Sequence, residues 1–204
     1  MAVRQANRAE RPGAPVGRKA SIDEADLMAR LSAAFREFGF EGATLTVLSR
    51  ATGLKRASLY HRFPDGKEQM AREVLEAAGT WLQVNVLAPL KDGGPPAERI
   101  GRMVGKLDEF YSGGRQACLL NLLSSAHIHE GPFTQLIRQT FEAWIGALTT
   151  TLVDAGLTEA TARARAERGV VLLQGSLVLS RGTGDTRPFR EFLKTLPQEL
   201  LGAD

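Results

Sequence analysis

The chain has 204 residues, of which 43% are hydrophobic, 24% charged and 6% aromatic, and its formal net charge is +3. Its 21 glycines, nine prolines and single cysteine exclude collagen-like, low-complexity and disulfide-rich classes, while the length allows one or two domains with a hydrophobic core. No apolar run is long enough to span a membrane and no secretory signal is present, so we expect a globular protein of the cytoplasm.

Residues 1–20 are basic and poor in large apolar side chains. They contain five arginines and lysines against one acid, Glu10, together with two prolines and two glycines. Such a segment cannot bury enough surface to offset its ordering entropy, so we expect it to be disordered. It is either a solvated tail or a basic arm that lies along nucleic-acid phosphates or enters a minor groove.

Three short helices are predicted next. A capping-box pattern at 21–24 starts a helix that Gly39 ends, with apolar residues at helical spacing. They are Leu27, Leu31, Ala34, Phe35 and Phe38. A second helix is expected over 45–52, with Thr44 as its N-cap and Gly53 as its end. The apolar pattern restarts at Leu54 and continues through Leu59 to Phe63, and we expect these residues and Leu48 to be core.

The remainder also reads as helical. The Pro-Asp-Gly break at 64–66 precedes a helix over 67–86 that ends before Pro89, and further helices are expected at 97–112, 116–127, 133–155, 158–182 and 188–201. No convincing pair of strands is present. The prediction is an all-α fold of about nine helices.

Basic residues concentrate in the two short helices and their exit. Arg50, Lys55, Arg56, Arg62 and Lys67 face a single acid within residues 44–67. Two short helices that meet at a glycine turn are the elements of a helix-turn-helix, whose second helix enters a major groove. Residues 44–67 therefore favour binding to double-stranded DNA.

Two kinds of DNA contact are expected within this motif. Thr44, Thr46, Ser58, Tyr60 and His61 suit close approach to phosphates. Arg56 lies early in the second helix, where its guanidinium could contact a guanine edge.

Residues 44–63, TLTVLSRATGLKRASLYHRF, resemble the DNA-binding signature of the tetracycline-repressor (TetR) family, as does the Lys67-Glu68 pair that opens the next helix. The resemblance is close over residues 22–85. It implies a transcriptional regulator, usually a repressor, that binds a palindromic operator as a homodimer and is released by a small molecule. It also implies that Thr46, Ser58, Tyr60 and His61 contact phosphates or the groove, and that Lys67 contacts a phosphate.

Three features depart from this family pattern. Lys55 stands where a serine commonly caps the second helix, so a cap is lost and a cation gained. Ser49 replaces a small apolar residue, and the link at 64–67 is one residue longer than usual.

We accordingly divide the chain into a basic arm (1–20), a three-helix DNA-binding domain (21–66) and a larger ligand-binding and dimerisation domain (67–204), whose first helix (67–88) connects the two. Cys118, Asn121, Ser125 and His129 recur at helical spacing, so this polar stripe faces either water or a pocket. The residues that could line a largely apolar effector site, each with plain core as the alternative, are Trp81, Phe110, Cys118, Asn121, Ser125, Phe141, Trp144 and Gln174.

The last two helices, at about 158–182 and 188–201, are apolar over wide faces. The family resemblance implies that they pair with their mates in a four-helix bundle, whereas a monomer would pack them internally. A dimer is favoured because one short recognition helix touches few base pairs.

No pattern indicates catalysis. His127 and His129 are a poor metal pair on a helix, Ser176 lacks the second glycine of a nucleophile elbow, and Cys118 has no thiol-enzyme signature. We predict neither enzyme activity nor a metal or cofactor. The alternative to a DNA-binding regulator is a small-molecule-binding module whose helix-turn-helix no longer engages DNA.

Overall fold

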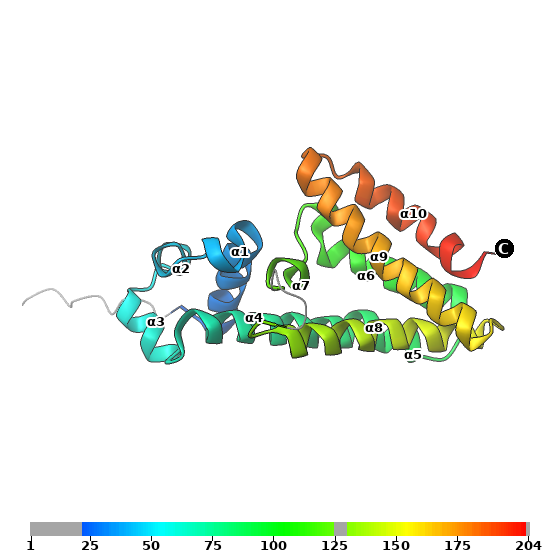
Figure 1. The fold of residues 1–204 in the computed structure, drawn as a ribbon, viewed down its shortest axis with the longest axis horizontal. Coiled ribbons are helices and arrows are strands. Elements are labelled where there is room, and N and C mark those ends of the chain that lie inside the picture. The colour runs from blue at the N-terminus through cyan, green and yellow to red at the C-terminus, as the bar shows by residue number, and fades with distance from the viewer. Residues whose placement is uncertain (1–21, 125–129, 203–204) are drawn as a thin grey trace, which may run out of the picture.

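The computed structural model describes residues 22–124 and 130–202, and every regular element in these ranges is helical (Figure 1). This confirms the all-α prediction. The elements are α1 (Glu24–Gly42), α2 (Leu45–Thr52), α3 (Arg56–Arg62), α4 (Gly66–Leu82), the π turn η1 (Gln83–Leu87), α5 (Ala88–Lys91), α6 (Pro96–Phe110), the 3-10 turn η2 (Ser112–Gly114), α7 (Leu119–Leu122), α8 (Thr134–Asp154), α9 (Glu159–Thr183) and α10 (Arg187–Leu201). None of the described helices has the length and apolar character to cross a membrane. The predicted basic arm, Ser125, His127 and His129 lie outside the described residues.

The N-terminal helices surround one hydrophobic cluster, the N-terminal core. Asp23 caps α1 by accepting a hydrogen bond from the Asp26 amide at 2.7 Å, and Gly39 interrupts the helical geometry with φ 66°. Leu31, Phe35, Leu48, Leu59 and Phe63 are completely buried in the core. Leu54 is only partly buried and Phe38 is exposed, so these two residues are less enclosed than their spacing predicted.

The long helix that leaves this core does not end before Pro89. The π turn η1 follows α4 directly, and the Ala88 amide donates to the Gln83 carbonyl five residues back. Pro89 then occupies the first turn of α5, where its missing N–H needs no helical partner. The helical path therefore runs to Lys91, five residues beyond the predicted end at 86.

The predicted helix at 116–127 is wrong in length. Within the described part of this segment only Leu119–Leu122 is helical, and Cys118 is its N-cap rather than an interior residue. Leu119 and Leu123 enter the N-terminal core, whereas Cys118 belongs to the second hydrophobic cluster. The leucine-rich run is apolar because it plugs the space between two cores, which a short turn achieves without a long helix.

Helices α6, α8, α9 and α10 enclose the C-terminal core, which is centred on residues such as Trp144, Leu173 and Phe189. A Cβ at Gly169 would lie 3.4 Å from both Leu196 and Leu200, so this glycine allows α10 to lie close against α9. The apolar face of α10 is consequently buried within the protomer, by Phe189, Phe192, Leu193, Leu196 and Leu200. In Figure 1, α4 extends from the N-terminal helices along α8 beneath this second group.

Candidate nucleic-acid interface

The turn between α2 and α3 is held by glycine geometry and by two hydroxyl side chains. Gly53 has φ 73° and ψ 4°, the left-handed conformation that a side chain disfavours. The Ser49 hydroxyl donates to the Leu54 carbonyl at 2.6 Å, and Thr52 donates to the Leu48 carbonyl at 2.8 Å. The hydroxyl at position 49, which departs from the family pattern, thus fastens the turn.

The two helices begin differently. The Thr44 hydroxyl accepts a hydrogen bond from the Val47 amide at 3.3 Å, which makes it the predicted N-cap of α2. Lys55 is the N-cap residue of α3, and its side chain makes no capping hydrogen bond, as expected for a lysine at this position. The seven-residue α3 is instead secured from below by the buried side chains of Leu59 and Phe63.

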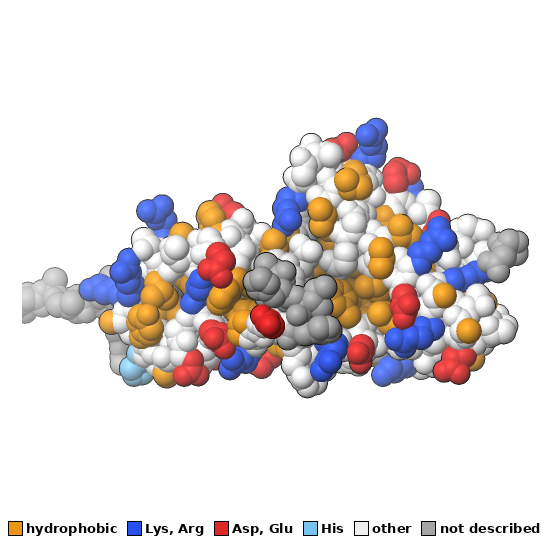
Figure 2. All heavy atoms as spheres, viewed as in Figure 1, with side chains coloured by type: hydrophobic (Ala, Val, Ile, Leu, Met, Phe, Trp, Pro, Cys, Tyr) orange, Lys and Arg blue, Asp and Glu red, His pale blue; other side chains and the backbone are white. Residues whose placement is uncertain are grey.

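Eight of the nine side chains predicted to contact DNA are exposed on one pair of helices. This α2–α3 face consists of Thr44, Thr46, Arg50, Lys55, Arg56, Ser58, Tyr60 and His61. Arg56 Nη2 donates to the Thr46 hydroxyl at 2.5 Å, which links the two helices across the face. Arg50 and Lys55 form no ion pair with any residue in the described ranges. Figure 2 shows basic side chains gathered at this end of the molecule.

The other two cations of the motif are engaged by the protein itself. Arg62 binds Glu24 of α1 and Glu73 of α4, the second at 2.8 Å, and hydrogen bonds from these carboxylates raise the pKa of its guanidinium. Lys67 donates to the Phe40 carbonyl at 2.8 Å and lies 4.2 Å from the centre of the Phe40 ring. A phosphate contact by Lys67 therefore requires this hydrogen bond to open.

Arg36 joins the N-terminal helices to the second group of helices and was not singled out by any motif. Its guanidinium donates to the Ala117 carbonyl and lies 5.2 Å from the centre of the Phe110 ring. Burial lowers the pKa of this guanidinium. Sequence spacing placed Arg36 on the solvated face of α1, because nothing in α1 alone indicates that the loop at 117 comes down onto it.

We expect Arg36→Met to lower the free energy of unfolding by about 1 to 2 kcal/mol, since it keeps most of the aliphatic stem but leaves the Ala117 carbonyl without its charged donor. Urea denaturation measures this difference. Arg30→Met is the matched control on the same helix, because Arg30 is exposed and forms only an i,i+4 pair with Asp26. Equal stability of the two variants would contradict a structural role for the Arg36 contact.

The predicted effector residues separate into distinct places. Phe110, Cys118 and Trp144 line one small cavity, and Trp81 stacks on Phe110 with ring centres 4.7 Å apart. Phe141 packs against both cores, while Asn121 is exposed and Gln174 is half-buried on α9. The Cys118 sulfur accepts hydrogen bonds from the Tyr111 hydroxyl at 3.5 Å and from Gln174 Nε2 at 3.4 Å. These candidates therefore do not form a single polar stripe on one helix.

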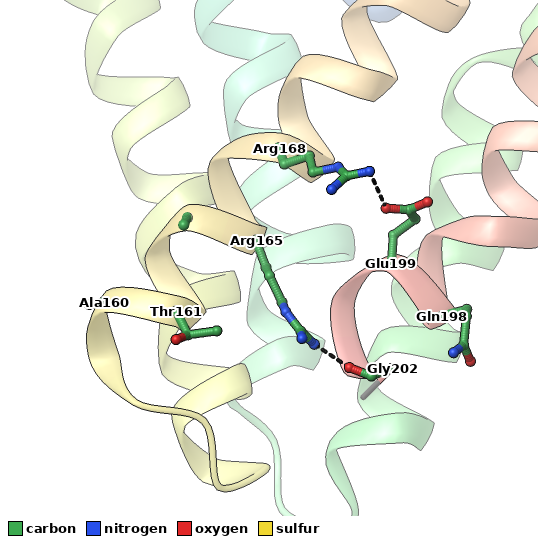
Figure 3. Close-up of a pocket in the computed structure, with 8 residues that line it drawn as sticks. Ala160, Thr161, Arg165, Arg168, Gln198, Glu199 and Gly202 are labelled. Atoms are coloured by element: carbon green, nitrogen blue, oxygen red, sulfur yellow. Dashed lines mark hydrogen bonds and ion pairs between the residues drawn. The ribbon is translucent and has the colours of Figure 1, made fainter. Parts of the chain in front are cut away.

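A large surface hollow lies elsewhere, between the start of α9 and the end of α10 (Figure 3). It measures about 670 Å³ and contains none of the predicted effector residues. Arg168 pairs there with Glu199 at 3.1 Å, and Arg165 donates to the Leu200 carbonyl at 3.1 Å and to the Gly202 carbonyl. These contacts fasten the end of α10 to α9.

Comparison with protein families connects both halves of the chain to one group of proteins. Residues 28–74 match the family described as bacterial regulatory proteins, tetR family. Residues 96–195 match the C-terminal domain of LmrA/YxaF-like transcriptional regulators.

Individual relatives extend over most of the chain. The HTH-type transcriptional regulator LmrA of Bacillus subtilis is 23% identical over 176 residues, which cover 83% of this chain and 94% of LmrA. The uncharacterized HTH-type regulator YxaF of the same organism is 24% identical over 167 residues, or 80% and 87% of the two chains. A TetR regulator from Legionella pneumophila has the same fold, with a TM-score of 0.75 at 19% identity over 89% of this chain and 98% of its own.

Proposed function

The chain belongs to the TetR family of bacterial regulatory proteins and is a DNA-binding transcriptional regulator, and from this premise we propose that it is a homodimeric repressor that a small molecule releases from a palindromic operator. The observation that carries the proposal is the exposed α2–α3 face with its unpaired cations. Proteins of this family are regulators and not enzymes, which confirms the prediction that the chain has no catalytic role. We place its action in the cytoplasm, where its DNA would be.

The proposed contacts with DNA divide by side chain. Arg50 and Lys55 neutralise phosphates, and the hydroxyl groups of the α2–α3 face donate to phosphate oxygens. Arg56 reads a base edge after its hydrogen bond to Thr46 is exchanged for one to a guanine. Lys67 adds a phosphate contact when its ammonium leaves the Phe40 carbonyl.

The exposed face of α9 supports a homodimer. Val171, Leu172, Val178 and Leu179 are apolar and exposed there, while the inward face of the same helix packs on the C-terminal core. Exposed aliphatic side chains grouped on one helix indicate a protein interface. We propose that α9, with the adjoining outer face of α10, pairs with its mate, and that two-fold symmetry presents two α3 helices to successive half-sites.

The proposed release by a small molecule uses the two connections between the halves. α4 contributes Met70 and Val74 to the N-terminal core and Leu82 to the C-terminal core, and Arg36 links α1 to the ring of Phe110. A ligand that shifts these elements changes the separation of the two α3 helices. A coupling of about 1 to 3 kcal/mol would weaken operator binding by about 5- to 150-fold.

The proposal is tested by selecting bound fragments from genomic DNA and footprinting the strongest site. We expect a palindrome, and we expect Arg56→Ala to relax the preference at one base position per half-site, at a cost of about 1 to 3 kcal/mol for the preferred base. If no fragment is retained at low ionic strength, the protein is a small-molecule-binding module without DNA affinity. If the recovered sites have no two-fold symmetry, the dimeric arrangement is wrong.

A further inference from the structure

An elongated groove runs between α4 with η1 and the facing side of α8. It has a volume of about 390 Å³ and is lined mainly by aliphatic groups, including Leu82, Val84, Leu87, Leu136 and Ala143. This volume lies within the range of small-molecule sites. One wall contains the π turn, and such turns occur frequently at functional sites because they widen the helix locally.

A small closed cavity lies directly behind this α4–α8 groove. This inner cavity measures about 20 Å³, and it shares Gly79, Leu82 and Thr140 with the groove. Gly79 has no side chain, and a Cβ built there would approach the Thr140 hydroxyl to 4.0 Å. The partition between groove and cavity therefore consists of small groups, which allows a ligand to pass from one to the other after a small displacement.

Trp144 gives the inner cavity an unused hydrogen-bond donor. The side chain lines the cavity and is only 2% exposed, and its Nε1 is buried without an acceptor among the described residues. A buried indole N–H normally has a partner, because an unsatisfied donor costs about 1 to 3 kcal/mol. The rest of the lining is uncharged, with the rings of Phe110 and Tyr111 on one side.

We propose that the α4–α8 groove and the inner cavity together bind an uncharged, largely apolar molecule that inserts one hydrogen-bond acceptor past Gly79 to Trp144 Nε1. The groove holds the body of the molecule and the inner cavity holds the acceptor. The proposal rests on the ligand response of the proposed function, since occupation of this site would move α4 away from α8. It also explains the position of Phe110, which forms a wall of the cavity and carries Arg36 on its ring.

Prodan, 6-propionyl-2-(dimethylamino)naphthalene, is a suitable probe because it is apolar, carries one ketone acceptor and shifts its emission when it leaves water. We expect saturable binding of one molecule per protomer in a fluorescence titration of the free protein. Trp144→Phe keeps an aromatic ring but removes the donor, so it should raise the Kd about tenfold. The same variant should unfold at an equal or higher temperature, because it also removes an unsatisfied buried group.

Gly79→Val tests the path between groove and cavity. We expect it to raise the Kd at least about tenfold by filling the partition, with Gly105→Val as the matched control. Gly105 is an exposed glycine within α6, and a Cβ there meets nothing within 4 Å. Absence of prodan binding to the wild type, or equal Kd values for wild type, Trp144→Phe and Gly79→Val, would overturn the site.

Operator release is measured separately, by the anisotropy of a labelled operator with and without prodan. Binding of prodan that depends on Trp144 but leaves the operator bound would support the site and count against the ligand response of the proposed function. Release of the operator by other compounds, together with no binding of prodan, would have the opposite meaning.

Discussion

Replacing Arg50, Lys55 and Arg56 together by glutamine is expected to lower operator affinity by at least about 10³-fold at 0.15 M salt. These three exposed cations of the α2–α3 face would make four to six phosphate or base contacts per dimer, and each phosphate contact contributes about 0.9 to the slope of log K against log salt. The slope should therefore fall in magnitude by about four to five units. Measuring binding at several salt concentrations checks both quantities.

The control for this triple variant removes the same number of charges elsewhere. Lys91, Arg115 and Arg138 are exposed on the second group of helices, so their replacement by glutamine changes the net charge equally. We expect this control to change affinity by less than about tenfold, because charges far from the contact are largely screened. If both triple variants lost affinity equally, the effect would be one of net charge and the α2–α3 face would not be the interface.

Val171→Glu should convert the proposed dimer into a monomer and reduce operator affinity by about two orders of magnitude or more. Val171 lies on the outer face of α9 with 67% of its surface exposed, and a carboxylate there would be buried without a partner in a symmetric interface. Loss of one protomer removes half of the DNA contacts, and these carry the salt-dependent affinity. Sedimentation equilibrium gives the oligomeric state, and gel shift gives the affinity.

Val84→Glu is the matched control, because Val84 is 61% exposed but lies on η1, away from α9. We expect it to leave both oligomeric state and operator affinity unchanged. Leu179→Glu, on the same outer face as Val171, should reproduce the loss. A wild-type protein that is monomeric at working concentration, or a Val171→Glu variant that stays dimeric, would refute this assignment of the interface.

The local chemistry of the sequence was sufficient to locate the helix-turn-helix. The Thr44 cap and the left-handed Gly53 depend on groups that lie within a few residues of each other, so a linear pattern contains the required information. The exposure of the eight residues on the α2–α3 face follows from the same periodicity that buries Leu48 and Leu59. Amphipathic helices can be read in this way because one turn brings residues three and four apart together.

What tertiary structure alone decided is how distant segments use the same residue types. Arg62 and Lys67 look like the other cations of the motif, yet carboxylates from α1 and α4 and a carbonyl of α1 engage them. The leucines at 119–123 predicted a helix because apolar spacing does not reveal that the segment divides between two cores. Chain sequence thus determined the helices and their exposed chemistry, which arise from local contacts, whereas the pairing of Arg36 with Phe110 and the unsatisfied Trp144 depend on packing between segments far apart in the chain.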